Sequence, residues 1–66
     1  MAIFKVIEVI GTSEISWEEA TRNAVKSASK TIKNIKSVYV KEQKAMITGE
    51  NITEFRVILK ISFELN

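Results

Sequence analysis

A strictly alternating run at the end of the chain limits the possible folds more than any other feature. Apolar side chains occupy every second position from residue 55 to residue 65: Phe55, Val57, Leu59, Ile61, Phe63 and Leu65. Successive side chains of a β-strand point to opposite faces, so a period of two is typical of a strand with one buried face. Such a face needs another layer of secondary structure to cover it. The final segment therefore predicts a strand packed against a helix or a second sheet.

Two earlier segments also have the composition of strands. Residues 3–10 are mostly β-branched and apolar, and Gly11, Thr12 and Ser13 are predicted to break this first strand. Residues 38–47 predict a second strand, and the turn residues 49–51 separate it from the last one. The last two strands are therefore expected to form an antiparallel hairpin.

A helix is predicted between the first two strands. Ser16 and Glu19 have the S-x-x-E spacing of a capping box, in which the Ser16 hydroxyl accepts from the Glu19 N–H and the Glu19 carboxylate accepts from the Ser16 N–H. The helix is expected to begin near Trp17. Small and apolar residues then recur at intervals of three and four as far as residue 35: Ala20, Ala24, Val25, Ala28, Ile32 and Ile35. The expected fold class is α+β, a β-α-β-β chain whose three-stranded antiparallel sheet wraps around one helix, with residues 1–66 as a single domain.

The residue types that the sequence lacks narrow the function. A 66-residue chain forms a small core, which rarely contributes more than ~3–5 kcal/mol, and no Cys or His supplies a disulfide or a typical zinc site. Exposed sheet edges and one uncovered sheet face favour association with further copies of the chain. Because His, Cys and Asp are all absent, the common catalytic triads are excluded and the protein is not expected to be an enzyme.

Charge and hydropathy exclude further classes of partner. Ten Lys and Arg against eight Glu give a net charge of +2, and the lysines at residues 26–36 are typical of a solvated helix end rather than a nucleic-acid site. Residues 1–11 are interrupted by Lys5 and Glu8, so they predict neither a signal peptide nor a membrane span. A cytoplasmic protein with no nucleic-acid or membrane partner is expected.

Two features remain as candidates for binding. The carboxylates of Glu8, Glu14, Glu18 and Glu42 are weak candidate ligands for a hard cation such as calcium, although carboxylates in a first helical turn more often complement the helix dipole. Trp17, the only Trp, is predicted to pack beneath the cap or in a subunit contact rather than to form a ligand platform. Tyr39 is likewise predicted to pack across strands rather than to act in catalysis.

Several segments together resemble the dodecin family. They are FKVIEVIGTS at Phe4–Ser13, SWEEA at Ser16–Ala20, a helix closing on Ile35, and FRVILKISFEL at Phe55–Leu65. The resemblance covers essentially the whole chain. It implies a β-α-β-β subunit assembled as a hollow homododecamer of cubic symmetry, in which many members store flavins such as riboflavin or FMN.

The resemblance also identifies the positions of the family's flavin pocket. Ser37 stands where flavin-binding dodecins have a ring-stacking Trp, Arg56 stands where they have a Gln that pairs with the ring, and Lys44 lines the same pocket. Ser37 offers no π face and Arg56 has only donors, so tight flavin binding is not expected. The context of Trp17 is similar to a subgroup of dodecins that lacks the flavin Trp and for which calcium binding has been proposed.

The expected function is a dodecin-like homododecameric cage that binds or stores a small ligand through Ser37, Lys44 and Arg56. An anionic or phosphate-bearing ligand suits the two cations. The alternatives are a calcium-binding dodecin and a purely structural or interaction protein without flavin.

Overall fold

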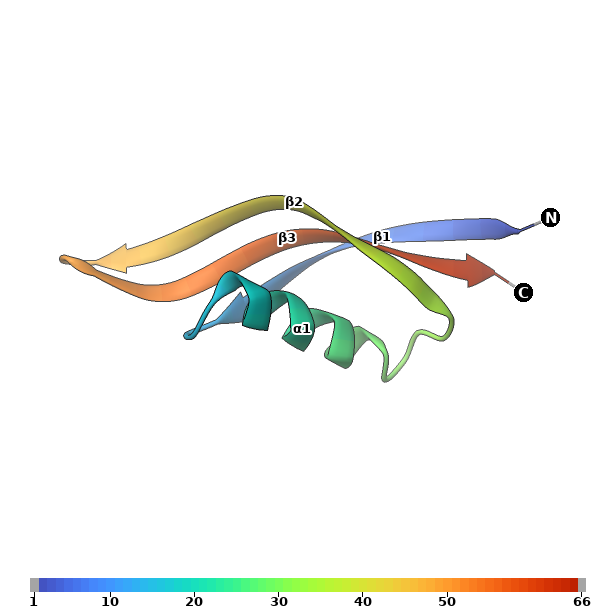
Figure 1. Cartoon of the computed structure of the whole chain (residues 1–66), viewed down its shortest axis with the longest axis horizontal. Coiled ribbons are helices and arrows are strands. Elements are labelled where there is room, and N and C mark those ends of the chain that lie inside the picture. Colours follow the sequence, from blue (N-terminus) through green and yellow to red (C-terminus); the bar gives the residue numbers. More distant parts are fainter. Residues whose placement is uncertain (1, 66) are drawn as a thin grey trace.

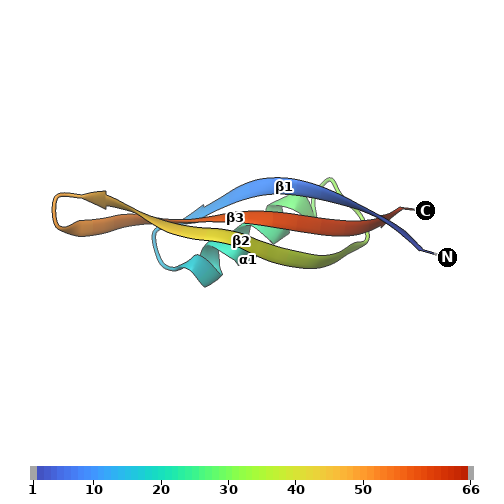
Figure 2. The ribbon, with the colours of Figure 1, turned by 90° about the horizontal axis from the view of Figure 1, so that it is seen from above.

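The sheet of this protein has its last strand in the middle and one helix across one face. The computed structural model describes residues 2–65, with β1 (Ile3–Ser13), α1 (Trp17–Ala28), β2 (Ile35–Thr48) and β3 (Asn51–Leu65). All strand pairs are antiparallel and the strand order is β1-β3-β2 (Figures 1 and 2). Among these residues, no helix is long and apolar enough to cross a membrane. The architecture confirms the predicted α+β class and the β-α-β-β order.

The alternating face of β3 forms the core, as its sequence predicts. Val57, Leu59 and Ile61 are fully buried, and so is Ala20 of α1. Val9, Trp17 and Ala24 pack around this cluster from β1 and α1. Because β3 has a neighbour on both sides and a helix over one face, these positions lose nearly all contact with water.

Gly11 does not end the first strand, which corrects the sequence-based boundary. β1 continues through Gly11, Thr12 and Ser13, which pair with Val57, Arg56 and Phe55 of β3. A Cβ at Gly11 would lie 2.5 Å from the carbonyl oxygen of Ala20 and 2.9 Å from the Cβ of Ala24. The glycine therefore allows β1 and α1 to approach closely, and it does not form a turn.

The helix ends earlier than its apolar pattern predicts. α1 stops at Ala28, and the Ser29 hydroxyl donates to the carbonyl oxygen of Val25, a local bond that competes with further helix. Asn34 has φ of +63°, a left-handed conformation that Asn tolerates better than most residues. Ile35, predicted to close the helix, instead begins β2 and pairs with Phe63.

Only half of the predicted capping box forms at the start of the helix. The Ser16 hydroxyl accepts from the Glu19 N–H at 3.0 Å, as expected. The Ser16 N–H donates to the Ser13 hydroxyl at 3.4 Å instead of to the Glu19 carboxylate. Two serines thus share the role that the sequence assigns to a Ser and a Glu.

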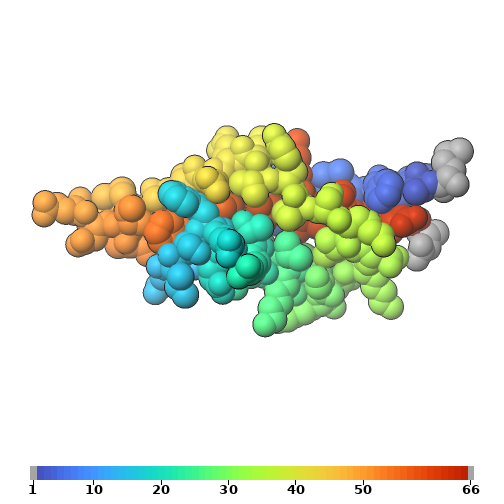
Figure 3. All heavy atoms as spheres, viewed as in Figure 1, coloured from blue at the N-terminus to red at the C-terminus, as the bar shows by residue number. Residues whose placement is uncertain are grey.

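β2 and β3 form a long hairpin that projects beyond the rest of the molecule. The strands pair up to Thr48 and Asn51, earlier in β3 than its apolar pattern indicates, and Gly49 and Glu50 form the turn. Gly49 has φ of +63°, which suits the first turn position of a two-residue hairpin. The molecule measures 51 × 20 × 13 Å, and the hairpin tip extends past the start of α1 (Figures 1 and 3).

Among residues 2–65, no helix or strand lies over the sheet face opposite α1, here called the open face. The register places the even-numbered residues of β3 from Glu54 to Glu64 on this face together with their partners on the two edge strands. It carries Phe4, Val6, Glu8, Ile10 and Thr12 from β1, Arg56, Ile58, Lys60, Ser62 and Glu64 from β3, and Ser37, Tyr39, Glu42, Lys44 and Met46 from β2. All three candidate ligand-binding residues are therefore on one face.

Candidate functional site

A row of three donor side chains crosses the open face. Arg56 of β3 is paired with Lys44 of β2 on one side and with Thr12 of β1 on the other. Residues directly opposite in an antiparallel pair have Cβ atoms about 4.5–5.5 Å apart, so the row presents a guanidinium, an ammonium and a hydroxyl side by side. Lys44 and Arg56 were both predicted from the sequence. Thr12 was not, because only the register of β1 against β3 places it here.

Arg56 is anchored by an acidic neighbour on its own strand. Its Nε donates to a carboxylate oxygen of Glu54, two residues earlier on the same face. A guanidinium has five N–H donors, so the terminal amino groups retain theirs for another acceptor. The row therefore keeps a net positive charge together with free directional donors.

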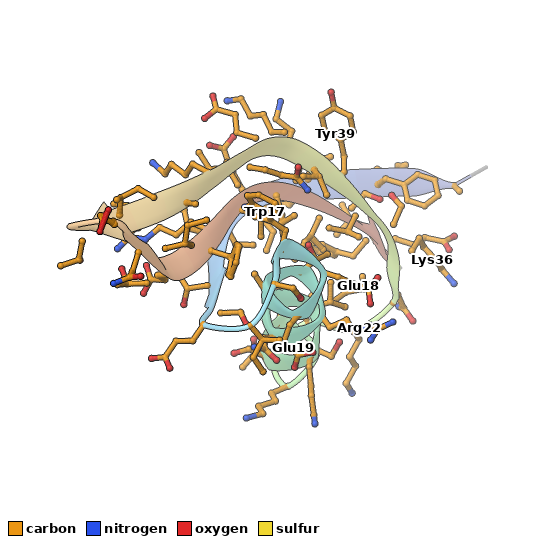
Figure 4. All side chains as sticks on the ribbon, turned by 60° about the vertical axis from the view of Figure 1, so that its left-hand side comes forward. Trp17, Glu18, Glu19, Arg22, Lys36 and Tyr39 are labelled. Atoms are coloured by element: carbon orange, nitrogen blue, oxygen red, sulfur yellow. The ribbon has the colours of Figure 1, made fainter. Side chains whose placement is uncertain are left out.

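Trp17 fixes the backbone of this row from the helix side. Its Nε1 donates to the carbonyl oxygen of Lys44 at 3.0 Å, and its ring meets that of Phe55 edge-on, with the ring centroids 5.1 Å apart. Figure 4 shows Trp17 between the sheet and the helix, whereas Tyr39 points away from the helix. Trp17 thus packs beneath the cap as predicted. Its ring is half-buried and already engaged, so it positions β2 and does not offer a free ligand platform.

Ser37 lies on the open face but far along the strands from the row formed by Lys44, Arg56 and Thr12. It pairs with Ser62 of β3, and the two hydroxyls contact each other. Ser62 and Arg56 are six residues apart on β3, which corresponds to about 20 Å at ~3.4 Å per residue. The structure therefore brings Lys44 and Arg56 together within one subunit but leaves Ser37 apart from them.

Tyr39 is the nearest aromatic neighbour of Ser37 along the same face of β2. It stands opposite Lys60 and is 64% exposed. Its predicted packing across strands is therefore wrong within one subunit, because Lys60 covers little of the ring.

The four acidic candidates for a cation site do not converge. Glu8 pairs with Lys41 at 3.5 Å on the open face, whereas Glu18 pairs with Arg22 at 3.1 Å on the helix (Figure 4). Glu42 lies on the open face opposite Ile58, and Glu14 is exposed in the loop before α1. Within residues 2–65 no three acidic side chains form a group that could hold a metal ion.

Ser37, Lys44 and Arg56, which the resemblance relates to a flavin pocket, carry no side chain that could stack on a flavin ring. Ser37 is occupied by its contact with Ser62 and has no ring, and Arg56 offers donors only. The pocket positions carry polar and cationic groups instead of a stacking surface. This donor set suits an anion better than a flat neutral ring.

Comparisons with known proteins agree with this fold over nearly the whole chain. The sequence model of the Dodecin family matches residues 3–66. Calcium dodecin of Mycobacterium tuberculosis is 35% identical over 65 residues, which are 98% of this chain and 92% of that protein. Dodecin of Thermus thermophilus is 33% identical over 63 residues, which are 96% of this chain and 91% of that protein.

Solved structures show the same similarity in three dimensions. A dodecin from Streptomyces davaonensis superposes with a TM-score of 0.94 at 28% identity, covering 98% of this chain and 96% of that one. The structure of calcium dodecin from Mycobacterium tuberculosis, described as calcium chelating, superposes with a TM-score of 0.85 at 34% identity, covering 97% of this chain and 91% of that one. With a family match over residues 3–66 and a relative that is 35% identical over 98% of this chain, this chain belongs to the dodecin family.

Proposed function

We propose that this protein is a non-catalytic, cytoplasmic dodecin that assembles as a homododecamer and binds or stores a small anionic ligand between subunits. The observation that carries this proposal is the separation of Ser37 from Lys44 and Arg56 on one open face. A single subunit cannot place both groups on one small molecule. A second copy lying antiparallel on the same face would bring its Ser37 toward the first copy's Lys44 and Arg56.

The charges of the row favour an anionic ligand. Like charges directly opposite each other in a sheet destabilise the pair, and Lys44 stands directly opposite Arg56. Glu54 carries one negative charge against the two positive charges of Lys44 and Arg56, so the row keeps a net positive charge. A phosphate or carboxylate between the two cations would relieve the remaining repulsion and accept charge-assisted hydrogen bonds.

Flavin titration tests the ligand class. The unmodified protein is expected to purify colourless and to quench riboflavin fluorescence poorly. The double variant Ser37→Trp with Arg56→Gln is expected to gain roughly ten- to a thousandfold in flavin affinity, since stacking contributes ~1–3 kcal/mol and an oriented hydrogen bond ~0.5–1.5 kcal/mol. Tight quenching by the unmodified protein would contradict the proposed ligand class.

The mass of the assembly and its affinity for phosphate test the other two parts of the proposal, the homododecamer and the anion site. Native mass spectrometry is expected to give a mass near twelve times 7.5 kDa. Inorganic phosphate and FMN are expected to bind more weakly when Lys44 is changed to Met, whereas Lys5→Met serves as a matched control that removes a lysine from outside the row. A monomer at micromolar concentration would refute the assembly, and phosphate affinity equal in both variants would refute the anion site.

Calcium binding is the second candidate function, because calcium dodecin of Mycobacterium tuberculosis is 35% identical over 98% of the length of this chain. Isothermal titration with calcium alone tests it. If one or more calcium ions bind per pair of subunits, changing Glu8 or Glu42 of the open face to Gln is expected to remove this binding. That result would support calcium, rather than an anion, as the ligand. A purely structural role would leave the protein assembled and unresponsive to calcium, phosphate and FMN.

A further inference from the structure

The rest of the subunit fixes the middle of β2 only weakly. β2 is an edge strand that pairs with β3 on one side. Ile35 and Ala45 are partly covered, and the other residues of the strand are exposed. The ladder with β3 is also interrupted by register shifts on both sides of residues 42–46. Few contacts within the subunit therefore hold residues 42–46 in place.

This segment carries Lys44, whose position matters for the proposed anion site. Lys44 stands directly opposite Arg56, and two cations facing each other across a sheet repel. An edge strand that is irregular on both sides can move away from its neighbour under such repulsion. An anion held by both cations requires one defined spacing between them. The site therefore depends on a contact that prevents this movement.

Trp17 supplies such a contact from the side of the sheet that faces the helix. Its indole Nε1 donates to the carbonyl oxygen of Lys44 at 3.0 Å. Its ring meets Phe55 edge-on, with 5.1 Å between the ring centroids. Phe55 precedes Arg56 on β3, and it pairs with Ala45, the residue that follows Lys44 on β2. One side chain of the helix thus contacts both strands that carry the cations, at the level of the cations.

The start of α1 is itself well fixed, so Trp17 can restrain β2. The Ser16 hydroxyl caps the helix by accepting from the Glu19 N–H at 3.0 Å. The Thr21 hydroxyl donates to the carbonyl oxygen of Trp17 at 3.0 Å. Ala20, in the same turn of the helix, is fully buried in the core. The indole therefore extends to β2 from a part of the helix that is anchored on the sheet.

We infer that Trp17 is a positioning residue for the anion site and acts through the carbonyl oxygen of Lys44. It holds β2 against β3 so that the Lys44 ammonium and the Arg56 guanidinium converge on one anion. Trp17 lies between the sheet and the helix (Figure 4), whereas the two cations are on the open face, so the indole acts without touching the ligand. The inference rests on the anion site proposed above and adds a residue that sets its geometry.

A matched pair of variants tests this role by their affinity for inorganic phosphate. Trp17→Phe keeps a ring against Phe55 but removes the donor to the Lys44 carbonyl oxygen. Its phosphate affinity is expected to fall about two- to tenfold, the factor that corresponds to one hydrogen bond. The control, Ser16→Ala, weakens the start of the same helix but removes no contact with β2, so its phosphate affinity is expected to equal that of the unmodified protein. Isothermal titration at a fixed subunit concentration measures both.

The outcomes separate this inference from the anion site itself. Equal phosphate affinity of Trp17→Phe and the unmodified protein would overturn the positioning role and leave the anion site standing. Equal weakening in Trp17→Phe and Ser16→Ala would also overturn it, because Trp17 would then act only through the stability of the helix. An unmodified protein that binds no phosphate would refute the anion site and this inference together.

The fluorescence of Trp17 gives a second readout that needs no substitution at this residue. Coupling between two sites is reciprocal, so an anion that binds better when Trp17 holds β2 must in turn favour the held state. Because the chain has one Trp, quenching by acrylamide reports the exposure of this indole alone. Phosphate is expected to lower the quenching constant relative to sodium chloride of equal ionic strength, and Lys44→Met is expected to abolish this effect. Quenching that bound phosphate leaves unchanged, or that phosphate lowers equally in Lys44→Met, would overturn the inference.

Discussion

Replacing Gly11 by Ala tests the close packing of α1 on β1. The added Cβ would lie 2.5 Å from the Ala20 carbonyl oxygen and 2.9 Å from the Ala24 Cβ, whereas ordinary contact begins at 3.4 Å. The nearest obstacle is a backbone atom of the helix, which cannot rotate away as a flexible side chain would. The helix must therefore move off the sheet by about 0.9 Å.

The displacement affects the whole core because Ala20 lies at its centre. A gap of ~0.5–1 Å already loses a quarter to a half of the dispersion energy of each contact across it. Overpacking of this kind costs ~1–3 kcal/mol, and a backbone obstacle belongs at the upper end of that range. Alanine in a strand gains ~0.5–1 kcal/mol over glycine from reduced chain entropy. The expected net loss is about 2 kcal/mol of unfolding free energy per subunit.

Urea denaturation at a fixed subunit concentration measures this loss. The fluorescence of Trp17, the only Trp, reports separation of the helix from Phe55 and the sheet. Adding Ala24→Gly to the variant should not restore the stability, because the 2.5 Å contact with the helix backbone remains and glycine within a helix costs about 1 kcal/mol. Unchanged or increased stability of Gly11→Ala would refute the packing argument.

Two further substitutions test the start of the helix and its link to the sheet. Ser16→Ala removes the acceptor of the Glu19 N–H and is expected to cost about 1 kcal/mol in urea unfolding, with assembly unchanged by light scattering. Trp17→Phe keeps an aromatic ring against Phe55 but removes the donor to the Lys44 carbonyl oxygen, and is expected to cost ~0.5–1.5 kcal/mol. Trp17→Ala should cost more than Trp17→Phe in the same assay, and equal values would show that the ring packing contributes nothing.

The sequence predicts the type and order of the elements better than their ends. The alternation of β3 is decisive because every second residue is apolar and the structure buries the middle of that series. Gly11 misleads because a glycine that permits a close helix contact has the same sequence signature as one that makes a turn. Ile35 misleads because its spacing continues the helical stripe, whereas pairing with Phe63 draws it into β2.

The candidate site depends on information that no single segment contains. Lys44 and Arg56 become neighbours only through the hairpin register, which includes bulges between Val40 and Glu42 and between Met46 and Ile47. Thr12 joins them through a second register, that of β1. The separation of Ser37 follows from the same pairing. Sequence patterns predict which residues share a face, but distances along that face require the strand alignment.

One face of the sheet stabilises the fold, and the other face carries the residues proposed to bind a ligand. Substitutions on the second face could therefore change ligand affinity without unfolding the subunit. Val57 and Leu59 on the helix face are fully buried and hold the fold, whereas Ser37 contacts Ser62 and Arg56 contacts Glu54 on the open face. Exposed substitutions away from packed cores usually change stability by no more than ~0.5 kcal/mol. Ser37→Trp with Arg56→Gln should therefore alter ligand affinity without altering urea unfolding at a fixed subunit concentration. A large loss of stability in that double variant would mean that these two positions pack against the second copy proposed to lie on the open face, and that ligand choice and assembly are coupled in this protein.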